Sequence, residues 1–378
     1  MKRIMKFSEL FESSNKLTEQ QILWLDRGLT PHYPQRYKRA DSSWSFNEST
    51  GLVDVHGSFK VRHSYDEPED VKSKIRVKFG TVTHDFKCDS EFITTLENSP
   101  RIVGGTFDCS KNEIKSLEGG PVEVGGDYDC EWTKITSLKG APKRIGGNFK
   151  LRSSELTTLM GGPEYVGGDL DLVRNKLIDI KGAPKEVGGD FICDHNRIVS
   201  LEGAPERINN DFNVSHNKLK DLKGSPKWIG KTFDIRDNDI KTLADGPEYI
   251  GEYYFVSGNS LISLEGSPIG LKLKDIPTFD DNRGLSPETL DIIEAARRKS
   301  PKTTYNTLLI KNLDKFNSDD CAILMKQLSN KELDKYFKEN PIDLYWLDEL
   351  PEIKSGVLQR TGIKDWSKLG RLKNSGLL

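Results

Sequence analysis

Apolar residues recur along much of the chain with a period of 21 residues. The apolar pattern of each repeat opens with an aromatic or large apolar residue, and a smaller apolar residue follows two positions later. Two Ile or Leu positions come next. In one repeat these residues are Phe107, Cys109, Ile114 and Leu117, and Val124 closes it. A step of two residues indicates a short strand with both side chains on one face, so we expect these positions to form the core.

Repeats of this pattern start without an insertion at nine positions, which are 83, 104, 125, 146, 167, 188, 209, 230 and 251. A segment of 21 residues is too short to bury an apolar face alone, so successive repeats must stack and place equivalent residues in columns. We therefore predict an α+β repeat solenoid with short parallel strands over residues 83–271. A repeat within this solenoid is called a rung below.

Proline and glycine mark the turns of each repeat. Every repeat has a proline after its second leucine, as at Pro121, and most have glycine two residues before it. Because proline fixes φ and glycine permits positive φ, the chain must turn there. A glycine pair opens five repeats and Asn209–Asn210 replaces it in a sixth, so we expect positive φ at that corner as well.

One polar column follows the strand in most repeats. We expect its amides to be buried and to satisfy backbone groups of neighbouring turns. Glu91, Thr133 and Ser154 interrupt this ladder. The ladder residues are Asn112, Asn175, Asn196, Asn217, Asn238 and Asn259.

The flanking segments have different patterns. Thr18 and Gln21 have the spacing of a capping box and predict a helix from Glu19 to about Arg27 that stops at Gly28. Residues 59–61 repeat the strand pattern and predict an irregular first rung. Beyond position 271, helix-start signals predict a helical bundle. The expected domains are a leader and helix (1–43), a small cap (44–82), nine repeats (83–271) and a C-terminal helical domain (272–378).

Charge and composition narrow the functional classes. Lys plus Arg total 56 against 58 Asp plus Glu, which disfavours a broad basic surface for nucleic acid. No apolar run approaches the roughly 18 residues of a membrane span. Five cysteines are too few for a disulfide scaffold. We expect a protein partner, with neither nucleic acid nor membrane, and no cofactor.

Residues 187–205, VGGDFICDHNRIVSLEGAP, resemble the short leucine-rich repeats of a mostly uncharacterised family in large tailed bacteriophages and some bacteria. Residues 44–59 resemble the entry to the solenoid in that family. The resemblance implies a leucine-rich-repeat-like fold that presents a binding surface. Residues 7–12 resemble the leader of many phage structural proteins, within which Leu10-Phe11-Glu12 resembles a prohead protease cleavage pattern.

Acidic residues flank the aromatic strand position in several repeats. We weigh two interpretations: a solvated face that suppresses aggregation, which is the default, and a stripe that binds a partner. The calcium-loop spacing that would support divalent cation binding is absent from this stripe. The stripe comprises Asp108, Asp127, Asp129, Asp169, Asp171, Asp190, Asp211 and Asp234.

Other reactive residues favour structural interpretations. The inner column that holds Cys109 and Cys130 carries Leu, Val or Ile in other repeats, so core packing is favoured over a thiolate site. His195 and His216 share an outward column beside Arg174, close enough to share a ligand, although exposed polar residues are expected there anyway.

Three functional hypotheses remain. The favoured one is a non-enzymatic docking component of a phage virion, built for protein–protein interaction. The alternative is a phage protein in the host cytoplasm that binds a host or defence protein. A repeat-type effector with a catalytic Cys321 is disfavoured, because Cys321-Ala322-Ile323 lacks the Cys-x-Asp pattern of such enzymes.

Overall fold

The computed structural model describes residues 16–29, 43–63, 67–262 and residue 282. The chain divides into two compact units, Met1–Lys218 and Leu219–Leu378. The expected leader, and all of the expected C-terminal helical domain except Asn282, lie outside the described residues.

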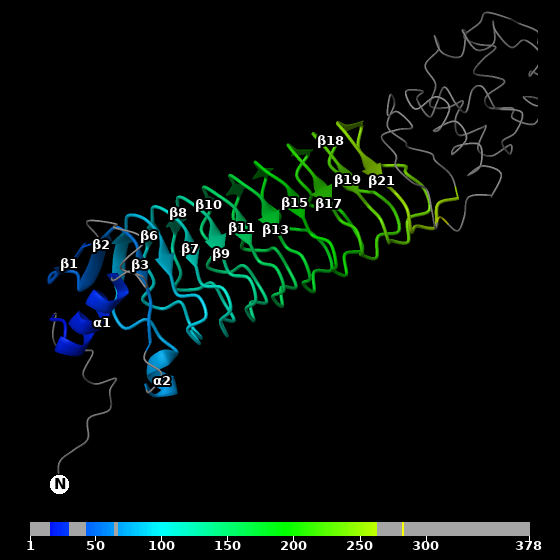
Figure 1. Ribbon diagram of the computed structural model, residues 1–378. Coiled ribbons are helices and arrows are strands. Elements are labelled where there is room, and N and C mark those ends of the chain that lie inside the picture. The colour runs from blue at the N-terminus through cyan, green and yellow to red at the C-terminus, as the bar shows by residue number, and fades with distance from the viewer. Residues whose placement is uncertain (1–15, 30–42, 64–66, 263–281, 283–378) are drawn as a thin grey trace, which may run out of the picture. The chain divides into compact units, whose positions relative to one another are not determined.

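The first unit is a parallel β-solenoid in which the repeats contribute short strands to two sheets (Figure 1). The first sheet has the order β1-β2-β4-β6-β8-β10-β12-β14, and all its neighbours are parallel except β1 and β2. Its strands are β1 (Ser43–Asn47), β2 (Leu52–His56), β4 (Phe79–Val82), β6 (Ile102–Val103), β8 (Glu123–Val124), β10 (Arg144–Ile145), β12 (Tyr165–Val166) and β14 (Glu186–Val187). The following strand, β16 (Arg207–Ile208), contacts β14.

The second sheet holds the predicted aromatic strands. In the first unit its parallel strands are β3 (Phe59–Lys60), β5 (Phe86–Lys87), β7 (Phe107–Asp108), β9 (Tyr128–Asp129), β11 (Phe149–Lys150), β13 (Leu170–Asp171), β15 (Phe191–Ile192) and β17 (Phe212–Asn213). Phe107 pairs with Phe86 and with Tyr128, so equivalent residues of successive rungs lie side by side. Both Phe107 and Cys109 are fully buried, which confirms the predicted inward face.

The second unit repeats this arrangement. Strand β18 (Trp228–Ile229) pairs in parallel with β20 (Tyr249–Ile250), and β19 (Phe233–Asp234) pairs in parallel with β21 (Tyr254–Phe255). Asn282, the one described residue beyond position 262, is buried, and its amide donates to the carbonyl oxygen of Val256 at 3.2 Å. A residue from the segment predicted to be helical therefore contacts the last described rung.

The described rungs consist of strands and turns. The helices among the described residues are α1 (Glu19–Leu29) and α2 (Glu69–Lys72), both before the repeats, so the described rungs lack the helical part of the expected α+β pattern. The capping box of α1 is confirmed, because Thr18 N donates to Gln21 Oε1 at 2.8 Å and Gln21 N donates to Thr18 Oγ1 at 3.2 Å.

Gly28 does not end α1 as predicted. The helix continues to Leu29, and a Cβ on Gly28 would overlap the ring of Phe59. Phe59 pairs with Phe86 at the register of a rung, as the strand pattern predicts. Gly28 therefore permits close helix packing on this first rung.

Glycine is needed for different reasons at the two glycine-rich corners of a rung. The glycine two residues before the proline has positive φ, as predicted, at Gly119 and its equivalents through Gly224. The prediction of positive φ at the glycine pair is wrong, because none of those glycines, nor Asn209–Asn210, has positive φ. A Cβ on Gly125 would instead overlap the carbonyl oxygen of Gly104, so the pair permits close approach between successive rungs.

Candidate functional site

The outer face of the second sheet carries the predicted acidic residues in two columns. Asp127, Asp169, Asp190 and Asp211 precede the aromatic strand position, whereas Asp108, Asp129, Asp171 and Asp234 follow it. All are partly buried except Asp234, whose exposed fraction is 6%. Their carboxylates therefore lie against the backbone rather than on a freely solvated surface.

The first acidic column forms a second ladder between rungs. Asp127 Oδ1 accepts the backbone N–H of Asn148 at 2.8 Å, and Asn148 Oδ1 accepts that of Asp169 at 2.7 Å. Asp169 in turn accepts the N–H of Asp190, which accepts that of Asp211. Asp and Asn are interchangeable here because each supplies one acceptor oxygen.

The second acidic column closes the turn after each strand. Asp108 Oδ1 accepts the N–H and the hydroxyl of Ser110 at 3.1 and 2.8 Å. Asp129 and Asp171 likewise accept the N–H two residues on. These are the local bonds by which Asp side chains favour turns. One oxygen of each carboxylate therefore has a structural role that the charge pattern does not predict.

The remaining carboxylate oxygens partly pair with cations. Lys150 Nζ lies 2.9 Å from Asp127 Oδ2, and Arg152 Nη2 lies 2.8 Å from Asp171 Oδ2. Partial burial opposes ionisation of Asp127, but the N–H of Asn148 and the ammonium of Lys150 outweigh it and lower its pKa. The face therefore alternates in charge and is not uniformly acidic.

Near the middle of this face, negative charge is concentrated. Burial raises the pKa of Asp129, and the charge of Asp108 adds to this effect. Burial also raises the pKa of Glu131, with further contributions from Asp129 and Asp171. The Nε atom of Arg152 lies 3.7 Å from Glu131 Oε1. Because Arg152 also pairs with Asp171, its positive charge balances the negative charge of Asp129 and Glu131 only in part.

Beside the acidic columns runs a column in which non-glycine residues adopt positive φ. In the first unit φ lies between 51° and 58° at every member of this left-handed column. Its members are Ser90, Lys111, Trp132, Ser153, Arg174, His195 and His216. This conformation costs roughly 1–2 kcal/mol for a residue other than glycine. Backbone bonds to the next rung hold it, as from Trp132 N to the carbonyl oxygen of Arg152 at 3.0 Å.

Trp132 is the large apolar residue of the left-handed column. It is 54% exposed, although it follows Glu131 directly on the partly charged face. The sequence places His195, His216 and Arg174 in this column but does not reveal its backbone conformation, because Lys, Trp, Ser, Arg and His carry no signature of left-handed backbone. Its position directly before the ladder residue, Thr133 in this rung, is the signal that could have identified it.

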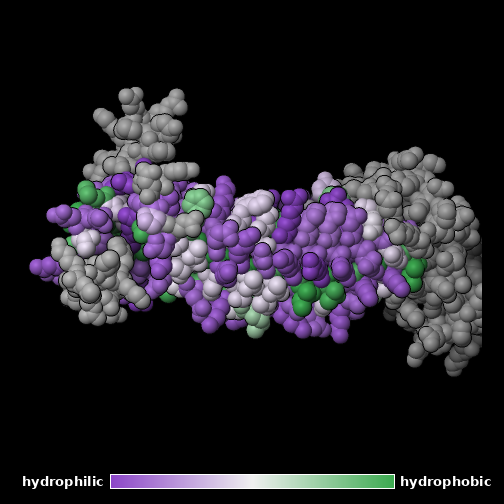
Figure 2. Space-filling model, turned by 90° about the horizontal axis from the view of Figure 1, so that it is seen from below, coloured by the Kyte–Doolittle hydropathy of each residue, from purple (hydrophilic) through white to green (hydrophobic). Residues whose placement is uncertain are grey.

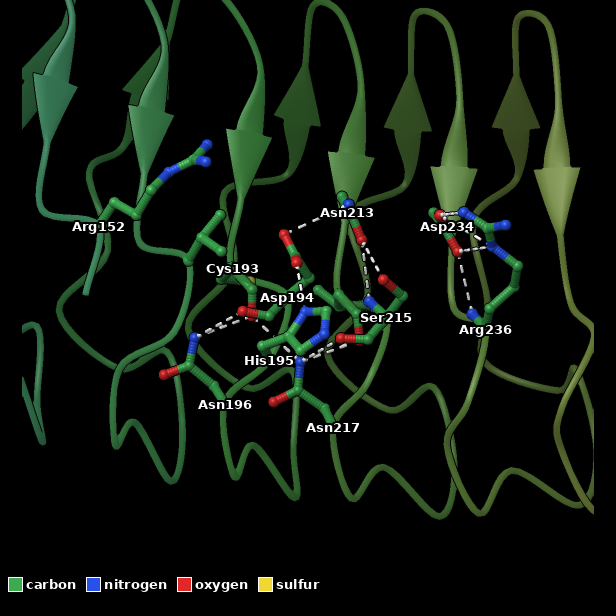
Figure 3. A network of polar contacts seen from close by, with 12 residues as sticks. Arg152, Cys193, Asp194, His195, Asn196, Asn213, Ser215, Asn217, Asp234 and Arg236 are labelled. Carbon is green, nitrogen blue, oxygen red and sulfur yellow. Dashed lines mark hydrogen bonds and ion pairs between the residues drawn. The ribbon is translucent and has the colours of Figure 1, made fainter.

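Further along the first unit, a polar network links His195 of the left-handed column to Asp194 and to Asn213 of the next rung (Figure 3). His195 Nδ1 lies 2.7 Å from Asp194 Oδ2, and Asn213 Nδ2 donates to Asp194 Oδ1 at 3.4 Å. Asn213 Oδ1 accepts both the N–H and the hydroxyl of Ser215. The ring of His216 stands 4.3 Å from that of His195, measured between centroids.

In the second unit, Asp234 makes a different contact. Arg236 Nη2 lies 2.6 Å from Asp234 Oδ2, and the Arg236 guanidinium stands 4.8 Å from the centre of the Phe255 ring. The side-chain bond to Asp234 raises the pKa of Arg236. Arg236 holds the carboxylate of Asp234, while Asp234 and the aromatic ring hold the guanidinium, which favours a structural role.

Beneath these columns lies the asparagine ladder. Asn112 Nδ2 donates to the carbonyl oxygens of Cys88, Cys109 and Ser110, and its Oδ1 accepts the N–H of Ile93 at 2.9 Å. The bonded groups belong to its own rung and to the preceding one. Asn175, Asn196, Asn238 and Asn259 are similarly buried, and Asn217 is partly buried. Where the ladder is interrupted, the hydroxyls of Thr133 and Ser154 bond each other and the carbonyl oxygen of Cys130.

The inner cysteines are packed in the core. Cys88, Cys109, Cys130 and Cys193 are free and fully buried, and burial raises the pKa of each thiol. A protonated, enclosed thiol is a poor nucleophile. Cys321 lies outside the described residues.

Within the described ranges, no group of three or more His, Cys, Asp or Glu side chains has the arrangement of a metal site. No helix in this part of the chain has the length and apolar character needed to cross a bilayer. The face drawn in Figure 2 is largely hydrophilic, with hydrophobic residues in small separate spots. Comparison with family models, curated proteins and solved structures finds no match to this chain.

Proposed function

We propose that the protein is a non-enzymatic binding protein that recognises a protein partner through the left-handed column of its first unit. The observation that carries this proposal is the pair of properties combined at Trp132, a strained backbone and an exposed aromatic side chain. Backbone strain at an exposed position is a reason to suspect function.

The composition of the left-handed column supports this role. Glycine or asparagine would satisfy its φ more easily, yet the first unit places Lys, Trp, Arg and His there. The ladder bonds and turn bonds of the rungs are carried by the Asn and Asp side chains of the neighbouring columns. Trp and Arg are also enriched among residues that dominate binding energy.

The acidic columns contribute to the proposed interface through their second oxygens. Asp129 and Glu131 belong to the rung of Trp132, and Glu131 directly precedes it, so negative charge lies beside the aromatic anchor. A partner segment with an apolar side chain and flanking basic residues would complement this centre.

The resemblance to phage repeat proteins suggests the setting. We propose that the partner is another virion subunit of a tailed phage. A host or defence protein bound in the infected cell is the alternative. Mass spectrometry of purified particles distinguishes them, because a virion component is recovered at a constant ratio to the capsid protein through successive purification steps.

Variants of Trp132 test the binding role. Trp132→Asn removes the aromatic ring and introduces a residue that tolerates positive φ, so the fold should be retained. Met160→Ala is the matched control, since Met160 is 60% exposed and lies in a loop away from the left-handed column. Each tagged protein is used to recover partners from infected cells, and the recovered proteins are quantified.

We expect at least one partner to bind wild type and Met160→Ala equally and Trp132→Asn at least tenfold less. A loss of about tenfold corresponds to about 1.4 kcal/mol, which is modest for an aromatic anchor. Equal recovery of all partners by Trp132→Asn with unchanged stability would refute the proposal.

A further inference from the structure

We propose that His195 and His216 form a binding site for a divalent transition-metal ion of the Zn²⁺ class, with water completing the coordination. The two residues occupy equivalent positions of successive rungs in the left-handed column. Their ring centroids are 4.3 Å apart, with an angle of 34° between the ring planes. This inference does not depend on the proposed binding function.

The separation of the rings lies just below the range that coordination of one ion by both requires. A Zn–N bond of about 2.1 Å places each ring centroid about 3.2 Å from the metal. For N–Zn–N angles between a right angle and the tetrahedral value, the centroids would stand roughly 4.5 to 5.2 Å apart. Both side chains are exposed, so a small rotation opens the observed 4.3 Å to this range.

Asp194 prepares His195 for this role. An ionised carboxylate can only accept hydrogen bonds, so the 2.7 Å contact between Asp194 Oδ2 and His195 Nδ1 places the proton on Nδ1. The Nε2 atom then keeps its lone pair for a metal. Asn213 holds the other Asp194 oxygen (Figure 3), which gives the carboxylate–histidine arrangement that orients metal ligands.

The backbone also fixes the pair. His195 has φ of 55° and His216 has φ of 51°, and the N–H of His195 donates to the carbonyl oxygen of Ser215 at 3.2 Å. Because the backbone is held in place, metal binding orders only two side chains. Arg174 precedes His195 by one rung in the same column, and its positive charge opposes a bound cation. Arg174→Gln should therefore strengthen metal binding.

Calorimetric titration of the full chain with ZnCl₂ at neutral pH tests the site. We expect one Zn²⁺ per chain with wild type, and at least tenfold weaker binding after either His195→Asn or His216→Asn. Asparagine tolerates positive φ, so these variants should keep their fold. Asp194→Asn should weaken binding about 10–100-fold through loss of the orienting bond.

His84→Asn is the control, because His84 is exposed, is bonded to Thr83, and lies outside the left-handed column. Its titration curve should match that of wild type. CuCl₂ should bind the same site more tightly than ZnCl₂, since first-row affinity generally peaks at copper. An absent Zn²⁺ signal in wild type would overturn the inference, as would an unchanged curve in both His195→Asn and His216→Asn.

Discussion

Asn196 offers a direct perturbation of the ladder beneath the candidate site. Its Nδ2 donates to the carbonyl oxygens of Leu172, Cys193 and Asp194 at 3.0, 3.1 and 3.2 Å, and its Oδ1 accepts the N–H of Leu177 at 3.0 Å. Replacing Asn196 by Leu removes all four bonds while retaining a side chain of similar size.

The four lost bonds contribute unequally to the free energy of unfolding. The carbonyl oxygen of Leu172 also accepts from Asn175, and that of Cys193 also accepts from Asn217, so both keep a donor. The N–H of Leu177 loses its acceptor inside the core, which costs about 1–3 kcal/mol. We therefore expect Asn196→Leu to lower the free energy of unfolding by about 2 kcal/mol.

A second variant separates the two halves of the amide. Asn196→Asp keeps an acceptor for Leu177 but places a carboxylate against three carbonyl oxygens. At pH 7 it should destabilise more than Asn196→Leu, because the second oxygen of a buried carboxylate then faces only acceptors. Its stability relative to wild type should recover in mild acid as the carboxyl is protonated and regains a donor.

Urea unfolding gives the stability changes, and hydrogen exchange reports the Leu177 amide itself. Faster exchange at Leu177 in Asn196→Leu, together with a lower midpoint, is the expected result. If the midpoint and the Leu177 exchange rate both remain at wild-type values, the ladder does not stabilise the rungs and the reasoning fails.

Three further predictions concern other sites. Ser154→Asn restores the ladder spacing and should raise the free energy of unfolding by about 1 kcal/mol in urea titration, and an unchanged midpoint would contradict this. Burial, with the charge of Arg76, lowers the pKa of His63 to about 4. Because this value is below the unfolded value, stability should be full above about pH 6.5 and fall by up to about 3 kcal/mol towards pH 4. Titrations of His63→Gln should lack this fall, and an identical pH profile would refute it. Cys109 should react with a thiol reagent only after unfolding, and rapid labelling of the native protein would show that the column is accessible.

The period of the sequence predicts the inner surface of the rungs because burial selects residues by size and polarity. Phe107 and Cys109 recur as apolar residues wherever the core needs them, so their side of the strand can be read from spacing alone. The strands of the other sheet, such as Glu123–Val124, are less visible, since Val124 has no second buried apolar residue two positions away.

The functions of the outer columns are less predictable. Asp127 and Asn148 differ in charge but share one acceptor oxygen, and the backbone N–H that each accepts is evident only once rungs are stacked. The glycine pairs do not adopt the positive φ that the sequence predicts; their lack of a side chain permits close approach between neighbouring rungs. Local sequence cannot separate these causes, because glycine satisfies both.

Site-specific photo-crosslinking tests most directly whether the left-handed column faces a partner. A photoreactive amino acid is placed at Trp132 or, as the control, at Met160, and each protein is irradiated in infected cells. We expect a crosslinked partner of defined mass from position 132 and none from position 160. Crosslinking only from position 160, or equal crosslinking from both, would contradict this expectation.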